Sequence, residues 1–151
     1  LTVHLRTRKE MSLVPAHWDL MPQILALRDK IAPETLIIGN GDILNIEDAK
    51  EKIKTSGCDG AMLGRAIFGN PWLFDENKKE ISIKEKLEVM CEHTKLFEEM
   101  LGGHKNFAIM KKHYKAYCND FRGAKELRVK LMEAENAGEV ESIVKDFLST
   151  Q

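Results

Sequence analysis

Short apolar segments alternate with amphipathic helical patterns in the first half of this sequence, and this alternation constrains the fold most. Three segments, Leu1–Leu5, Thr35–Gly39 and Gly60–Leu63, are typical of strands buried on both faces of a sheet. Helical patterns over residues 17–31 and 45–57 separate them. Parallel strands connected through helices require right-handed crossovers. The first half is therefore predicted to be a βαβαβ unit of an α/β protein.

The two helical patterns also predict details. In the first, apolar residues spaced by four, three and four positions predict one buried face, formed by Leu20, Ile24, Leu27 and Ile31. The second begins at Asn45, a good N-cap, and ends at Gly57, a typical C-terminal glycine.

After Phe74 the pattern is helical only. Amphipathic segments cover residues 82–101, 106–121, 123–134 and 137–149, separated by glycines. The stretch from Gly69 to Phe74 is predicted to be a turn closed by an aromatic side chain. A polar linker, "DENKKE", places the boundary near residue 75, so an all-α bundle is expected over 76–151.

Composition excludes several classes of protein. The net charge is −1, 31% of residues are charged, and no apolar run reaches the roughly 20 residues of a membrane span. The three cysteines form no CxxC pair, which favours a reducing cytoplasm and buried packing roles over disulfides or a zinc site; they are Cys58, Cys91 and Cys118. Because Leu1 already lies in a strand pattern, we expect the chain to be a piece of a longer protein.

All three predicted strands are followed by polar, basic or glycine-rich residues. Ordinary loop chemistry explains any one of these ends, but parallel strands bring all three to the edge where α/β proteins bind ligands. Glycine turns before helices and an arginine suit a phosphate group. The residues are His4, Arg6 and Arg8 after the first strand, Gly39, Asn40, Gly41 and Asp42 after the second, and Gly64 and Arg65 after the third.

The segment from Leu101 to Lys130 is strongly basic, with eight Lys and Arg residues against two acidic ones. Aromatic and histidine side chains are interleaved with these charges. Such a pattern suits contact with an RNA backbone and stacking on bases. A solvated helix face explains the charges equally well, so both interpretations stay open from composition.

Four stretches together resemble the flavin-dependent tRNA-dihydrouridine synthases, nearest to the bacterial B-type branch. They are "LTVHLRTR", "IIGNGDI", "DGAMLGRAIFGNPWLF" and "MKKHYKAYCNDFRGAKELRVKL", in the order that the family has them. The resemblance implies that residues 1–75 are the last three βα units of an FMN-binding TIM (β/α)8 barrel. Residues 76–151 would be a helical tRNA-binding domain.

The resemblance also implies functional residues. His4 would lie near the flavin ring or the target uridine, whereas the FMN phosphate and ribityl chain would be held by Asn40, Gly41, Asp42, Gly64 and Arg65. Contacts to RNA would come from Arg6, Lys111, Lys112, His113, Tyr117, Arg122, Lys125 and Arg128.

The reaction implied is reduction of the C5–C6 double bond of tRNA uridines by flavin hydride, with NADPH reducing the flavin. Such an enzyme would be cytoplasmic, with no membrane and no obligate protein partner.

The sequence departs from the family pattern in two ways. Leu5 stands where the family usually has glycine. The family's proton-donating cysteine and a flavin-contacting lysine lie on earlier strands of the barrel, and those strands are not among the 151 residues of this sequence. We therefore assign no catalytic residue and expect the 151 residues alone to be inactive. Three βα units cannot close a barrel, so the outer two strands should have unpaired edges that favour aggregation or dimerisation.

Two alternatives stay open. Another FMN-dependent TIM-barrel oxidoreductase, of the dihydroorotate or enoate type, would share the phosphate end but would have no use for the basic helical segment. A non-catalytic RNA-binding module would need only the helices, whereas the strand ends here keep their ligand-like residues.

Overall fold

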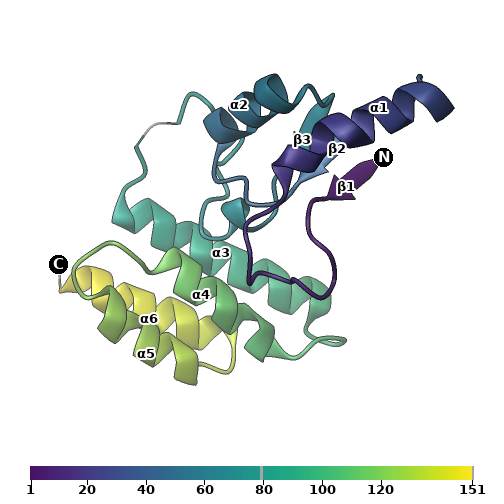
Figure 1. Ribbon diagram of the computed structural model, residues 1–151. Helices are drawn as coiled ribbons and strands as arrows, with labels where there is room; N and C mark the ends of the chain where they lie inside the picture. The colour runs from purple at the N-terminus through teal and green to yellow at the C-terminus, as the bar shows by residue number, and fades with distance from the viewer. Residues whose placement is uncertain (79, 151) are drawn as a thin grey trace. The chain divides into compact units, whose positions relative to one another are not determined.

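Figure 1 shows the computed structural model, which describes residues 1–78 and 80–150. The chain forms two compact units, Leu1–Ile67 and Phe68–Gln151. The predicted boundary lay at residue 75, whereas the structure groups residues 68–75 with the helical unit. None of the helices in the described part of the chain is long and apolar enough to cross a membrane.

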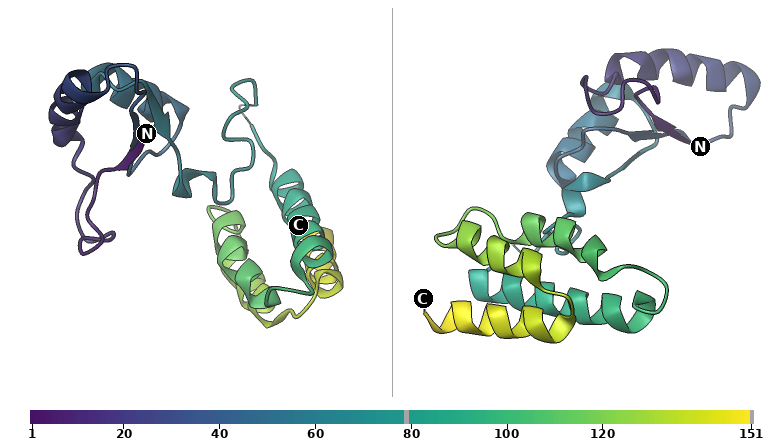
Figure 2. Two further views of the ribbon diagram at one scale, coloured as in Figure 1. Left: turned by 90° about the vertical axis from the view of Figure 1, so that its right-hand side faces the viewer. Right: turned by 90° about the horizontal axis from the view of Figure 1, so that it is seen from below.

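The first unit is the predicted βαβαβ arrangement. Its strands β1 (Thr2–His4), β2 (Ile38–Asn40) and β3 (Gly60–Met62) are parallel and lie in the order β1-β2-β3. Helices α1 (Met21–Ile31) and α2 (Ile46–Ser56) connect them and lie on the same side of the sheet (Figure 2). The outer strands β1 and β3 therefore each have one unpaired edge among the described residues, as predicted.

Strand β2 begins three residues later than the sequence pattern indicated. Just before the strand begins, the backbone N–H of Ile37 donates to the Asp59 carboxylate, with N and Oδ2 2.7 Å apart. This places Gly39 and Asn40 inside the strand and Gly41 immediately after it.

The buried face of α1 agrees with the prediction only at Ile24. Leu27 and Ile31 are 58% and 74% exposed, while Met21 is fully buried and Ile24 and Leu25 pack beside it. The face is thus one residue out of phase with the one expected. Residues spaced by three and four occur on both sides of this helix, so the spacing alone could not choose between them.

Helix α2 follows its sequence signals. The Asn45 side chain accepts from the Asp48 N–H, and Gly57 ends the helix with a left-handed φ of 77°. Leu5, Ile37 and Cys58 complete the small core between helices and sheet.

The second unit is a helical bundle, as predicted. Its α-helices are α3 (Ile83–Leu101), α4 (Lys111–Tyr117), α5 (Ala124–Glu133) and α6 (Ala137–Ser149), and the short 3-10 helix η3 (Phe107–Met110) leads into α4. Their core includes Leu87, Met90, Leu131 and Val140. Cys91 and Cys118 are buried in it, so all three cysteines have the expected packing role.

Candidate functional site

A cavity of about 490 Å³ lies at the carboxyl ends of the three strands. Its lining includes every residue predicted to hold a cofactor: His4, Asn40, Gly41, Asp42, Gly64 and Arg65. The three strand ends therefore meet at one cavity, although Arg8 and Gly39 are not among its lining residues. Asn40 adds a link across the strands, because its side-chain amide donates to the Met62 carbonyl at 2.7 Å.

The Asp42 carboxylate accepts hydrogen bonds from three other residues at this pocket. Its carboxylate accepts from the Arg6 guanidinium, from Arg65 Nη2 at 3.0 Å and from the Ala16 backbone N–H at 2.9 Å. The Arg6 hydrogen bond is the main reason why the pKa of Asp42 lies below its usual range. Two guanidinium groups against one carboxylate leave the cluster with a net positive charge, which suits an anionic ligand.

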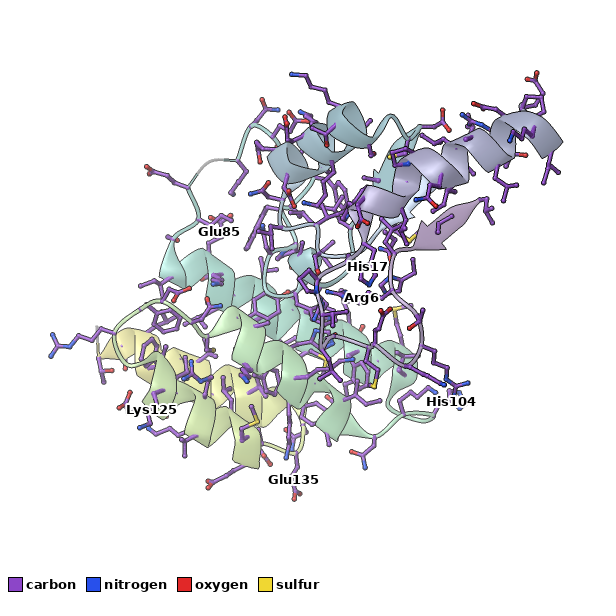
Figure 3. All side chains as sticks on the ribbon, viewed as in Figure 1. Arg6, His17, Glu85, His104, Lys125 and Glu135 are labelled. Carbon is purple, nitrogen blue, oxygen red and sulfur yellow. The ribbon has the colours of Figure 1, made fainter. Side chains whose placement is uncertain are left out.

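Arg6, one of the residues expected to contact RNA, has its side chain among protein partners in the structure. Its side chain is only 5% exposed. Besides the pair with Asp42, its Nε donates to the Val14 carbonyl at 2.6 Å. Figure 3 labels Arg6 and His17, which both line a second pocket of the first unit. A guanidinium held in this way positions the loop and Asp42.

The two pocket glycines have different roles. Gly41 has a φ of 137°, and an added Cβ would lie 2.7 Å from the Ala16 Cβ, so only glycine fits there. At Gly64 an added Cβ would meet nothing within 4 Å, so the backbone beside Arg65 faces open space. A ligand can therefore approach the main chain at Gly64, as the sequence suggested.

Neither helix that follows a pocket glycine begins in a way that favours an anion. The first turn of α2 is capped by Asn45 and carries Glu47 and Asp48, whose charges repel an anion. After Gly64 the chain forms only the three-residue 3-10 helix η2, Arg65–Ile67. Donors in this pocket are therefore side chains and loop N–H groups, without a helix dipole.

Sequence reasoning missed the segment 14–18, which folds back over the end of β2. Val14 accepts from Arg6, Ala16 donates to Asp42, and the Trp18 indole Nε1 donates to the Gly41 carbonyl at 2.8 Å. A tryptophan just before a helix was the only visible signal.

In the helical unit the basic segment divides into exposed and buried residues. Lys112, Lys115, Arg122 and Lys125 are exposed, while Lys111 and His113 are half-buried. Figure 3 labels Lys125 on α5.

Two residues of this segment that were expected to contact RNA pack against the protein itself. Tyr117 is 3% exposed and belongs to the core. Arg128 is half-buried, and its Nη1 donates to the Cys118 carbonyl at 2.5 Å, just past the end of α4. Both side chains stabilise the bundle.

The predicted RNA residue His113 lies in a cluster of rings. Its ring centroid is 5.0 Å from that of His93 and 5.2 Å from that of Phe68. Burial lowers the pKa of both histidines. His113 is thus half-buried and packed against two rings, next to the exposed Lys112.

The chain is similar to known proteins over nearly its whole length. Residues 1–151 match the family model described as dihydrouridine synthase (Dus). The chain is 41% identical over 148 residues to a probable tRNA-dihydrouridine synthase 2 of Bacillus subtilis, covering 97% of this chain and 46% of that protein. A probable tRNA-dihydrouridine synthase of Staphylococcus epidermidis is 42% identical over 148 residues, covering 97% and 45%. The chain thus spans a little under half the length of these relatives. With its whole length matched, this chain belongs to the dihydrouridine synthase family.

Proposed function

We propose that this chain is part of a flavin-dependent tRNA-dihydrouridine synthase that uses FMN and NADPH to reduce uridines in tRNA. The convergence of His4, Asn40, Gly41, Asp42, Gly64 and Arg65 on one cavity of about 490 Å³ carries the proposal. The first unit would hold the cofactor and the helical unit would bind tRNA.

The residues of the pocket fit a phosphorylated cofactor. Arg65 has a 65% exposed side chain, so its guanidinium can turn from Asp42 to a phosphate and donate two hydrogen bonds. Gly64 leaves its backbone open, and Asp42 keeps both arginines in place. When bound, FMN would supply the hydride for the uracil C5–C6 bond.

Replacing Arg65 with alanine is expected to raise the dissociation constant for FMN about tenfold. The reason is the loss of a charge-assisted hydrogen bond to the phosphate at an exposed position. Flavin fluorescence quenching with the complete gene product that contains these residues measures the constant. Arg8→Ala is the matched control and should bind FMN as the wild type does, because Arg8 is exposed and is not among the residues that line the cavity. Unchanged affinity in Arg65→Ala would contradict the cofactor site.

Removing the exposed positive charges of the helical unit is expected to lower the affinity for tRNA. It should also make that affinity less sensitive to salt concentration. For each side chain that no longer neutralises a phosphate, the slope of log affinity against log salt falls by about 0.7 to 0.9. Alanine at Lys112, Lys115, Arg122 and Lys125 together should therefore reduce the slope by about 3 units.

Filter binding at several salt concentrations measures this slope. The control carries alanine at Lys84 and Lys145, exposed lysines on α3 and α6, and should keep the wild-type slope. Equal slopes for both sets of variants would mean that the basic segment is only a solvated face.

The activity itself is tested by counting dihydrouridine in tRNA after incubation with the complete gene product, FMN and NADPH. Dihydrouridine formation supports the proposal. Retention of tRNA without any reduction, in a protein that also binds no FMN, would favour the RNA-binding module instead.

A further inference from the structure

Trp18 packs beside the end of β2, next to the residues that line the pocket. An added Cβ on Gly39 would lie 2.5 Å from the indole Cη2, so the ring occupies the space beside this glycine. The ring also belongs to the core around Met21 and has Lys52 Nζ 5.8 Å from its centroid. Its Nε1 donates to the Gly41 carbonyl at 2.8 Å. Both ring and donor are thus fixed.

This hydrogen bond determines the orientation of the peptide between Gly41 and Asp42. The described chain contains no cis peptide bond. In a planar trans peptide the C=O and the following N–H point in opposite directions. With the Gly41 carbonyl turned to the indole, the Asp42 N–H points away from it. Gly41 and Asp42 line the pocket, and Trp18 lies outside its lining.

We infer that Trp18 is a positioning residue that orients the Gly41–Asp42 peptide so that the Asp42 N–H donates to a phosphate group in the pocket. The inference rests on the proposed function and adds a residue that the cofactor never touches. The left-handed backbone at Asp42, with a φ of 50°, and at Gly41 agrees with a turn whose N–H groups face one side. Arg65 and this N–H would then bind the same anion from two strand ends.

The experiment compares a phosphorylated flavin with one that lacks the phosphate. Trp18→Phe keeps an aromatic ring beside Gly39 and removes the N–H donor. It is expected to raise the dissociation constant for FMN five- to tenfold, about the effect of one ordinary hydrogen bond, while that for riboflavin changes less than twofold. Fluorescence quenching gives both constants, and circular dichroism checks the fold.

A second variant separates the donor from the ring. Site-specific replacement of Trp18 by benzothienylalanine keeps the bicyclic ring and lacks the N–H. The inference expects the same selective loss for FMN. An equal loss of affinity for FMN and riboflavin, or no loss for either, would overturn the inference and leave Trp18 as a packing residue.

Failure of the proposed function gives a different result. If the wild type binds neither flavin, the proposed function fails, and the same proteins are titrated with inorganic phosphate by ³¹P line broadening. Weaker broadening in the two Trp18 variants supports the positioning role, whereas equal broadening overturns it.

Discussion

Replacing Gly69 with alanine is expected to lower the free energy of unfolding of the helical unit by about 3 kcal/mol. Gly69 has a left-handed φ of 74°, and an added Cβ would lie 2.2 Å from the Ala116 carbonyl oxygen. That oxygen cannot move away easily, because Tyr114 and Tyr117 on either side of it are buried in the core. Chemical denaturation followed by circular dichroism at 222 nm measures the loss.

Gly103→Ala is the matched control for this prediction. An added Cβ at Gly103 meets nothing within 4 Å, so the variant should unfold within about 0.5 kcal/mol of the wild type. Equal stability of the Gly69 and Gly103 variants would mean that the 68–75 segment does not rest on α4. The predicted result would give the glycine of "GNPW" a structural reason: it lets the chain lie directly on the backbone of α4.

The pocket could be predicted because its cause is visible in the sequence. Apolar strands followed by glycine, arginine and histidine place those residues at one edge of any parallel sheet. The limits of α2 were predictable for a similar reason, since Asn45 and Gly57 act locally. Features set by neighbours a few residues away need no knowledge of the tertiary fold.

The errors came from residues whose role depends on what packs against them. Tyr117 and Lys112 lie in the same short helix, yet the Tyr117 ring is buried and the Lys112 side chain is exposed. Their interleaving resembled an RNA-binding pattern, whereas α4 separates rings and charges onto different faces. The Arg6–Asp42 pair joins residues 36 positions apart, and no local signal indicates such a contact.

Replacing Arg6 with methionine is expected to lower the free energy of unfolding of the first unit by about 2 kcal/mol at pH 7. Breaking a fully buried ion pair costs about 3 to 5 kcal/mol, and the 31% exposure of the Asp42 side chain reduces this. Arg8→Met, at an exposed position in the same loop, should change stability by less than about 0.5 kcal/mol. Urea unfolding followed by Trp18 fluorescence in a Trp72→Phe background measures both.

The pH dependence distinguishes this ion pair from simple packing. The pKa of Asp42 is lowered in the folded state, so its contribution to stability is present above the unfolded value of about 3.9 and is lost as the pH falls through the folded value. The deficit of Arg6→Met should therefore shrink as the pH falls below about 3.9. A deficit that stays constant over this range would assign the effect to the aliphatic part of Arg6. Unchanged stability with weaker tRNA binding would instead restore Arg6 to the RNA surface, because only a side chain free of Asp42 could reach a phosphate there.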